Sequence, residues 1–415
     1  MNAEPDILII GGGMVGAALA CALGGQARTV VVLERGPWPD FPPDSPPDLR
    51  VSAISLANEQ ALNRLGIWPR VPAERQTPYR RLATWEWLRT PWGHSLPPFQ
   101  ATRFTADEAG TDHLGAIVEN RALQRAALEQ ACKTDGVTVL TDTAPEDMRF
   151  VQGRLEVRVN GFWWAPRLVV GADGALSRVR DAARIPLDAH PYDQWAMLIN
   201  VTLAHPPGDE TWQAFTPDGP RALLPLGSPD GVHRASLVWY DHPDAIRRWQ
   251  QADGETLLHA IRAHFPPQLP ALRAVEAVGA FPLVRRHAQR YWHGNTVLVG
   301  DAAHTIHPLA GQGVNLGFQD VLNLHAHLAP WLEGRTASPG SAPETYSRQR
   351  RAANLLMMRG MDVFYHGFSS RLPPLALARN VALALAHRAG PVKKQALKYA
   401  LGLTAPFQPQ QGSPT

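Results

Sequence analysis

The sequence contains little cysteine, little charge and no long apolar run. Its 415 residues include two cysteines, Cys21 and Cys132, which are too few and too far apart for a disulfide framework. Each lies in an apolar-patterned stretch, so we expect a small buried thiol at both positions. Charged residues make up 19% of the chain and the formal net charge is +3. The chain therefore lacks the basic excess that is typical of nucleic-acid-binding proteins.

No stretch of ~18 uninterrupted apolar residues is present, so the sequence predicts no membrane-spanning helix. The start, Met1 to Asp6, has no basic segment, and the apolar run after it breaks at Gly11–Gly13. This pattern argues against a signal peptide. We therefore expect a cytoplasmic protein, and attachment to the surface of the inner membrane is left open.

Positive charge is concentrated at the end of the chain. No acidic residue follows Asp362, so the chain before that point carries net negative charge. The basic residues after it are Arg371, Arg379, Arg388, Lys393, Lys394 and Lys398, and apolar residues such as Leu372, Leu375 and Leu377 lie among them. This composition indicates docking to an anionic membrane surface or to a partner, although a solvated helix face would carry the same charges.

Apolar runs near the start of the chain predict a parallel sheet. A strand at Asp6–Ile10, a helix at Met14–Leu23 and a second strand at Thr29–Glu34 follow one another closely, which is the opening of an α/β fold. A strand at Val137–Leu140 and a hairpin at Met148–Val159 are expected in the same sheet region.

The middle of the chain has a different pattern. From Pro191 to Leu283, alternating segments between Pro, Gly and Asp turns predict antiparallel strands. A long helix is expected over Gly313–Leu332, and the chain after Tyr346 is expected to be mostly helical.

Gly11, Gly13 and Gly16 form a G-x-G-x-x-G motif between the first strand and the first helix. The first glycine permits a tight turn, the second admits a pyrophosphate against the backbone, and the third lets helix and strand approach. The helix start offers N–H groups and a positive dipole end to the phosphates. Glu34, after the next strand, would bind a ribose 2′-hydroxyl and repel a 2′-phosphate. The motif therefore predicts FAD or NAD in preference to NADP.

A second glycine cluster, Gly300 to Gly317, favours a flavin. Asp301 follows a buried strand, where a carboxylate can bind a hydroxyl of the ribityl chain. Further on, Gly313, Val314 and Asn315 are expected in the first turn of a helix. Their N–H groups, at the positive end of the helix dipole, would stabilise the anion that forms on a reduced flavin. A nicotinamide dehydrogenase has no use for such an element, so the two clusters together predict FAD.

The same residues could carry a metal. Asp301, His304 and His307 are spaced so that three ligands could share one helical face. Pro308 interrupts any helix at that point, and no further ligand set completes a site. We expect no metal.

A hydrolase is a second alternative, because Asp173, Ser177 and a histidine could form a triad. No G-x-S-x-G elbow accompanies them. We expect Ser177 to cap a helix that begins at Arg178.

Tryptophan is abundant, with 13 residues in the chain. Taken singly, residues such as Trp85, Trp212 and Trp239 are expected in a core. Several of them fall in the antiparallel region, where they could also line an apolar cleft.

These motifs follow one another in the order found in a known family. The chain resembles the class A flavoprotein aromatic hydroxylases, which have the p-hydroxybenzoate hydroxylase fold, and within them the ubiquinone-biosynthesis hydroxylases. The matching residues are Gly11–Gly16, Arg50–Ile54, His113–Gly115, Val118–Asn120, Gly171–Gly174 and Gly300–Gly317. Further stretches are similar to the branch of that family that hydroxylates demethoxyubiquinol: Pro78–Leu82, Phe215–Arg221, Ser236–Tyr240 and Lys394–Leu403.

The resemblance implies a doubly wound, glutathione-reductase-like FAD-binding domain with an inserted, mostly antiparallel β substrate domain and a C-terminal helical region. We expect the FAD-binding domain over residues 1–78, 108–186 and 285–345. The substrate domain is expected over 79–107 and 187–284, the helical region over 346–405 and a flexible tail over 406–415.

The resemblance also implies roles for single residues. Glu34 corresponds to the acidic residue on the adenosine ribose, Arg50 to an arginine along the FAD, and Asp301 to the aspartate on the ribityl chain. Asp173 corresponds to an aspartate that touches FAD and is implicated in NAD(P)H use. The expected cofactor-binding residues are Gly11, Gly13, Met14, Val15, Gly16, Glu34, Arg50, Asp173, Gly300, Asp301, Pro308, Gly311, Gly313, Val314 and Asn315. Of these, Pro308, Gly311 and Gly313 are expected at the flavin ring.

The activity that the resemblance implies is hydroxylation of a polyprenylated benzoquinol, 2-polyprenyl-3-methyl-6-methoxy-1,4-benzoquinol, in ubiquinone biosynthesis. FAD would form a C4a-hydroperoxide with O2, and NAD(P)H would act as a transient co-substrate. The basic end of the chain would attach the protein to a membrane or to a complex of ubiquinone-biosynthesis enzymes. Three alternatives stay open: a sister hydroxylase acting at another ring position, a flavin-dependent prenyl reductase, and a flavin-stabilised subunit that carries lipid to other enzymes.

Overall fold

Short apolar runs form a six-stranded sheet in the computed structural model, which describes residues 4–42, 45–87, 101–307 and 313–369. Every residue of β1 (Ile7–Ile10) and of β12 (Leu168–Gly171) is buried. Strands that are apolar on both faces are typical of parallel sheets covered on both sides. Across the sheet the order is β18 (Trp292–His293), β19 (Thr296–Leu298), β12, β1, β2 (Val30–Leu33) and β8 (Val137–Leu140), with β18 antiparallel to its neighbour and the others parallel.

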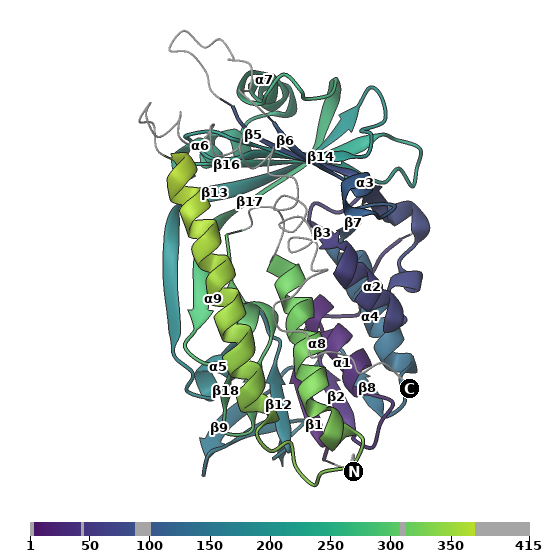
Figure 1. Cartoon of the computed structure of the whole chain (residues 1–415), viewed down its shortest axis with the longest axis vertical. Coiled ribbons are helices and arrows are strands. Elements are labelled where there is room, and N and C mark those ends of the chain that lie inside the picture. The colour runs from purple at the N-terminus through teal and green to yellow at the C-terminus, as the bar shows by residue number, and fades with distance from the viewer. Residues whose placement is uncertain (1–3, 43–44, 88–100, 308–312, 370–415) are drawn as a thin grey trace.

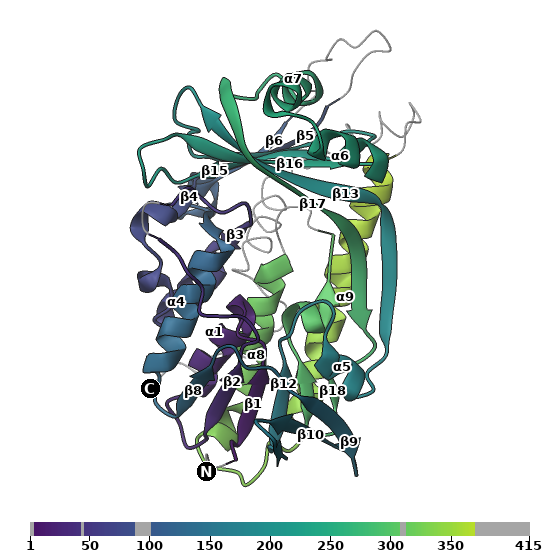
Figure 2. The same ribbon diagram turned by 180° about the vertical axis from the view of Figure 1, so that it is seen from behind.

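Helices cover one face of this sheet and a small sheet covers the other (Figures 1 and 2). The helices are α1 (Met14–Leu23), α4 (Asn120–Lys133) and α8 (Gly313–Leu332). The small sheet consists of β9 (Asp147–Val151), β10 (Arg154–Val159) and β11 (Phe162–Trp164).

The hairpin of β9 and β10 forms as predicted, but the prediction that it belongs to the parallel sheet is wrong. Burial alternates along β10, where Leu155, Val157 and Val159 enter the core and the residues between them do not. A strand with one apolar face can cover a sheet, but it cannot replace a strand whose two faces are both buried.

The second large sheet is mostly antiparallel, as the alternation over residues 191–283 predicted. Its longest strands, β13 (Leu187–Leu203) and β17 (Leu272–Ala288), pair with each other along their length. The order across the sheet is β20 (His304–Thr305), β17, β13, β16 (Arg234–Asp241), β15 (Arg221–Leu226), β14 (Glu210–Phe215), β5 (Arg81–Glu86) and β6 (Thr102–Thr105). The pair β14 and β5 is parallel.

Two helices cover the outer face of this sheet (Figure 1). They are α6 (Pro243–Gln250) and α7 (Gly254–His264). Trp85, Trp212 and Trp239 lie in the hydrophobic core between these helices and the sheet. These tryptophans are therefore core residues and do not line a cleft on the opposite face.

The long helix α9 (Ala342–Ser369) passes along both large sheets (Figures 1 and 2). Near its start, the hydroxyl of Tyr346 donates to the carbonyl of Leu298 in β19 at 2.8 Å. Near its end, Asp362 accepts a hydrogen bond of 2.7 Å from the hydroxyl of Tyr192 in β13 and pairs with Arg285 of β17. No helix in the described part of the chain combines the length and the apolar character needed to cross a membrane.

The remaining elements connect these layers. They are β3 (Val51–Ser55), α2 (Leu56–Arg64), η1 (Trp68–Arg70), η2 (Ala73–Arg75), β4 (Thr77–Tyr79), α3 (Ala106–Ala109), β7 (Gly115–Glu119) and α5 (Arg178–Ala182). The strand β17 passes through the predicted domain limit at residues 284/285 without a break, and the domain limits stay predictions. Residues 88–100 and 370–415, including the predicted tail 406–415 and the basic residues after Asp362, lie outside the described residues.

The two cysteines differ. Cys21 is buried, and burial raises the pKa of its thiol to about 12. Cys132 is exposed, so the expectation of a buried thiol there is wrong. The buried face of α4 ends at Ala131, and the next residue of a helix points about 100° away from that face.

Candidate cofactor and active site

The three motif glycines lie between β1 and α1, and the structure gives them different surroundings. Gly11 has a φ of +108°, and a Cβ there would lie 2.3 Å from the carbonyl oxygen of Ala172. A Cβ at Gly16 would lie 2.0 Å from the carbonyl oxygen of Gly11. Gly13 caps α1 in an extended conformation, and a Cβ there would meet no heavy atom within 4 Å. Gly11 and Gly16 therefore close the turn, whereas Gly13 faces open space.

Glu34 follows β2 and is held beside this loop. Its Oε2 accepts a hydrogen bond of 2.7 Å from the N–H of Gly12, and its Oε1 accepts one of 2.8 Å from the N–H of Gly36. Each carboxylate oxygen has a second lone pair. Glu34 can therefore accept further hydrogen bonds from ribose hydroxyls without breaking those it already has.

The second glycine cluster packs directly against the first. Gly300 starts the short helix η3 (Gly300–Ala302) with a φ of +57°. A Cβ at Gly300 would lie 3.3 Å from a methyl of Val15, and one at Gly317 would lie 2.7 Å from another. The side chain of Val15 thus fills the space that these two glycines leave, and it connects the start of α1 to η3 and α8.

Asp301 is exposed next to this contact. Although water reaches the side chain, the surrounding protein desolvates the carboxylate and raises its pKa above the ordinary value. The charges of His304, Arg50 and Arg286 act in the opposite direction. The structure therefore brings Asp301 and Arg50 close enough to interact electrostatically, and their roles toward FAD stay predictions. Arg286 of β17 was not predicted from the sequence.

The predicted helix is present as α8. The N–H of Asn315 was predicted to face the flavin, whereas its side chain bonds to other parts of the protein. This side chain is fully buried. Its Oδ1 accepts hydrogen bonds from the N–H of Ser55 (2.9 Å) and from Nδ2 of Asn58 (2.8 Å), and its Nδ2 donates to the carbonyl of Ala53 (2.7 Å). Asn315 therefore ties the first turn of α8 to β3 and α2.

The loop of Asp173 is also internally bonded. Its carboxylate accepts hydrogen bonds from the hydroxyl of Ser177 and from the N–H of Val179. The hydroxyl of Ser177 in turn accepts from the N–H of Arg180, so the predicted cap of α5 is confirmed. Buried Arg180 donates to the carbonyls of Ala175 and Ala302, both at 3.2 Å. This arginine connects the Asp173 loop to η3, and sequence reasoning missed it.

An aromatic and polar cluster around His307 lies on the face of the eight-stranded sheet opposite α6 and α7. A bulge in β13 falls between Pro191 and Trp195, and it presents Tyr192 and Gln194 to His307. The ring of His307 meets Tyr192 edge-on at 5.0 Å and stacks on Tyr240 at 5.6 Å. Its Nε2 lies 3.2 Å from Oε1 of Gln194. Burial lowers the pKa of His307 to about 4, so its imidazole is neutral at pH 7.

The two histidines of the metal set that was considered and rejected on the sequence have different partners. His304 contacts Asp320, whereas His307 contacts Gln194. No cluster of three His, Cys, Asp or Glu in the described ranges could hold a metal ion. Pro308 and Gly311, which were predicted at the flavin ring, lie outside the described residues.

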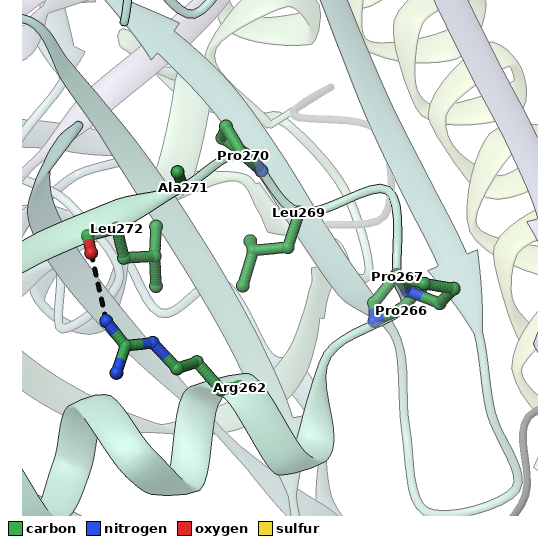
Figure 3. Close-up of a pocket in the computed structure, with 7 residues that line it drawn as sticks. All are labelled: Arg262, Pro266, Pro267, Leu269, Pro270, Ala271 and Leu272. Carbon is green, nitrogen blue, oxygen red and sulfur yellow. Dashed lines mark hydrogen bonds between the residues drawn. The ribbon is translucent and has the colours of Figure 1, made fainter. Parts of the chain in front are cut away.

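A hollow of about 320 Å³ lies elsewhere, beside the end of α7 and the start of β17 (Figure 3). Its lining consists of Arg262, Pro266, Pro267, Leu269, Pro270, Ala271 and Leu272. Arg262 donates a hydrogen bond of 3.0 Å to the carbonyl of Leu272. None of the predicted site residues that the structure describes contributes to this hollow.

The residues at the sheet edge fit a dinucleotide. Open space at Gly13 borders the start of α1, where N–H groups favour a pyrophosphate. Glu34 lies on one side of this point with spare acceptor capacity, and Asp301 lies exposed on the η3 side. This donor and acceptor set suits two polyol groups joined by phosphates, which is the form of FAD.

Comparison with known proteins defines the class. The family described as FAD binding domain matches residues 4–360. The chain belongs to this family, and its cofactor is FAD.

Individual relatives agree. The chain is 45% identical to 3-demethoxyubiquinol 3-hydroxylase of Escherichia coli (strain K12), over 97% of this chain and 100% of the relative. It is 34% identical to ubiquinone hydroxylase UbiL of Rhodospirillum rubrum, over 96% and 89% of the two chains. It is 31% identical to the human mitochondrial ubiquinone biosynthesis monooxygenase COQ6, over 95% and 92%.

Solved structures show the same fold. p-Nitrophenol 4-monooxygenase PnpA of Pseudomonas putida DLL-E4 superposes with a TM-score of 0.78 at 19% identity, over 97% of this chain and 99% of that one. PqsL of Pseudomonas aeruginosa superposes with a TM-score of 0.71 at 23% identity, over 91% and 99%. The predicted fold class and the prediction of an FAD-dependent monooxygenase are confirmed.

Proposed function

We propose that this protein hydroxylates the ring of the polyprenylated benzoquinol demethoxyubiquinol in ubiquinone biosynthesis, using FAD, O2 and NAD(P)H. The observation that carries the proposal is the 45% identity to a 3-demethoxyubiquinol 3-hydroxylase over that protein's whole length. The paired glycine loops, with Glu34 and Asp301 beside them, support the cofactor part of the proposal.

The residues around the loops would hold the cofactor as follows. The N–H groups at the start of α1 would bind the pyrophosphate next to Gly13, Glu34 would accept from the adenosine ribose, and Asp301 would accept from the ribityl chain. Arg50 would lie along the cofactor and balance the charge of Asp301. When bound, FAD supplies the redox chemistry that activates O2.

The first turn of α8 would stabilise negative charge at the flavin ring. The N–H groups of the first turn of a helix have no acceptor within the helix, and the helix dipole adds a partial positive charge there. Gly313 and Val314 start α8, and Asn315 fixes the orientation of this turn through its bonds to β3.

The inner face of the eight-stranded sheet would receive the quinol ring. Ala196, Val238, Tyr240 and Leu283 form an apolar cluster on this face, and such a surface excludes water from the reacting atoms. His307 lies on this face as a neutral imidazole, and its Nε2 donates to Oε1 of Gln194. The quinol is itself electron-rich, so the chain needs no strong base to activate it.

A sister activity is the second candidate. UbiL and COQ6 are also relatives over most of this chain. A hydroxylase that acts at a different ring position would use the same cofactor residues.

We also infer that the basic end of the chain attaches the protein to an anionic membrane surface or to other enzymes of the same biosynthesis. The six basic residues and the lack of acidic residues after Asp362 support this inference. Deletion of the residues after Gly390 should weaken sedimentation with vesicles of anionic lipid. Unchanged sedimentation, together with unchanged recovery of other biosynthetic enzymes, would remove the inference.

Mass spectrometry of quinone intermediates in cells that lack this protein tests the activity. Accumulated demethoxyubiquinone, removed again when the gene is restored, is the expected result. An earlier ring intermediate would move the activity to the sister hydroxylase. An intermediate that differs in chain unsaturation would indicate the prenyl reductase, and either of these results would overturn the proposal.

A further inference from the structure

Asp320 is a fully buried carboxylate beside the cofactor loop. It lies on α8, and its Oδ2 accepts a hydrogen bond of 3.0 Å from the N–H of Gly300 and lies 2.6 Å from Nε2 of His304. Gly300 is the first residue of η3, and His304 follows that helix after one residue. One carboxylate oxygen therefore contacts the chain on both sides of Asp301.

The other oxygen of Asp320 is held by α9. It accepts a hydrogen bond of 2.7 Å from Nε of Arg350 and a long one of 3.4 Å from Nδ2 of Asn354. Arg350 also donates to Oδ1 of Asn354 at 2.9 Å and to the carbonyl of Leu316 at 3.3 Å. All three side chains are buried or nearly so, which leaves the carboxylate one arrangement.

The charge on Asp320 is maintained despite its burial. Desolvation alone would raise the pKa of this carboxyl, but His304 and Arg350 hold the pKa below its ordinary value. Hydrogen bonds to an ionised group are stronger than those between neutral groups. The contacts to Gly300 and His304 therefore constrain η3 more firmly than neutral hydrogen bonds would.

This constraint matters because Gly300 has a φ of +57°. The turn that places Asp301 depends on this left-handed conformation, and the N–H of Gly300 is the group that Asp320 binds. If Asp320 were removed, this N–H would lose its buried acceptor, and the η3 turn would be free to move.

We propose that Asp320, held by Arg350 and Asn354, is a positioning residue for FAD that fixes the η3 turn so that Asp301 meets the cofactor. The proposal rests on the proposed contact between Asp301 and FAD. It adds α9 to the elements that determine cofactor affinity, although α9 contributes no predicted cofactor ligand.

The test is FAD binding to apoprotein, followed by flavin fluorescence, with the melting temperature measured with and without FAD. We expect Asp320→Ala to raise the Kd for FAD about 10- to 100-fold, by analogy with the loss of residues that orient metal ligands. Arg350→Met, which keeps the length of the side chain and removes its charge, should raise the Kd by a smaller factor. Asp230→Asn is the matched control, because Asp230 pairs with buried Arg234 in the other sheet at 2.6 Å. It should leave the Kd unchanged.

A double-mutant cycle separates positioning from a general loss of stability. If Asp320 acts through Asp301, Asp320→Ala should change the Kd little in a protein that already carries Asp301→Ala. An equal loss in both backgrounds, or a wild-type Kd in Asp320→Ala, would overturn the proposal. If Asp320→Ala fails to fold, Asp320→Asn and Arg350→Met take its place in the same cycle. Wild-type FAD affinity in both variants would overturn the proposal. These results are independent of the substrate, so a protein that binds FAD normally but does not hydroxylate demethoxyubiquinol would contradict the proposed function alone.

Discussion

Gly13 and Gly16 belong to one motif, but substitution should affect FAD affinity at Gly13 and the stability of the apoprotein at Gly16. A Cβ at Gly13 meets open space, whereas one at Gly16 would lie 2.0 Å from the carbonyl oxygen of Gly11. We expect Gly13→Ala to leave the apoprotein as stable as wild type and to lower its affinity for FAD at least tenfold, because the new methyl occupies the place of the pyrophosphate. Gly16→Ala should destabilise the apoprotein by more than about 1 kcal/mol, as overpacking does.

Urea unfolding of the apoproteins and FAD titration measure the two effects separately. An apo Gly13→Ala protein that is as unstable as Gly16→Ala would show that the space at Gly13 is not open. Wild-type FAD affinity in Gly13→Ala would place the pyrophosphate elsewhere.

His287 should make the protein sensitive to mild acid. Burial, with the nearby charge of Arg351, lowers the pKa of this histidine to about 4, and its Nε2 lies 2.8 Å from the hydroxyl of Tyr291. Between about pH 6.5 and pH 4 the unfolded chain binds a proton at this position and the folded chain does not, so its contribution to stability is present above pH 6.5 and is lost as the pH falls. The contribution lost between pH 7 and pH 5 is about 2 kcal/mol.

Urea unfolding of wild type and His287→Gln at pH 7 and pH 5 isolates this contribution. The free energy of unfolding of wild type should fall more than that of the variant. If the free energy of unfolding fell equally in the two proteins, His287 would be protonated in the folded protein at pH 5.

Single residues could be predicted where they belong to a sequence motif of known chemistry. Glu34 and Asp301 follow apolar strands within glycine-rich patterns, and both lie at the loops where they were expected. No role was predicted for Arg180, Arg286 or Asp320, because they act through backbone groups and charges that come together only in the folded chain.

At the scale of elements, the start of α8 depends on one side chain. Asn315 makes hydrogen bonds to Ala53, Ser55 and Asn58 in a fully buried place. Asn315→Ala would remove these three side-chain hydrogen bonds, while Nδ2 of Asn58 would keep its bond to the backbone carbonyl of residue 315. We expect the substitution to lower the free energy of unfolding by about 2–4 kcal/mol. The reduction potential of bound flavin should become more negative, since the N–H groups of this turn would no longer be fixed.

Asn323→Ala is the control on the same helix. Asn323 is half-buried and donates to Oε1 of Gln349 at 3.1 Å, so its loss should cost less than about 1 kcal/mol and leave the potential unchanged. An Asn315→Ala protein with wild-type stability and potential would show that α8 is held in place by its other contacts.

The elements themselves were largely predictable from periodicity. The helix predicted over Gly313–Leu332 has these same bounds in the structure, and the antiparallel pattern was also correct. The strands of the β9–β10 hairpin were predicted correctly, but their placement in the sheet was wrong. A strand joins one sheet or another according to which of its faces are buried, and this depends on what packs against it. The expectation that the tryptophans of β5, β14 and β16 lie in a core is confirmed. The alternative of an apolar cleft could be rejected only because α6 and α7 cover them.

In the whole molecule, the predicted cofactor residues and the apolar inner face of the second sheet meet around η3. Three elements, β13, β17 and α9, extend from one large sheet to the other (Figure 2). The loop that carries Asp301 continues to His307 on the inner face. This arrangement would let one chain hold FAD on one sheet and, as proposed, a quinol ring against the other.

Turnover of purified holoprotein with a short-chain demethoxyubiquinol, NAD(P)H and ¹⁸O2 tests the central claim most directly. We expect one labelled oxygen atom in the ring of the product, and no product in the absence of O2. Oxidation of NAD(P)H without labelled ring product, or reduction of the prenyl chain without consumption of O2, would contradict the account.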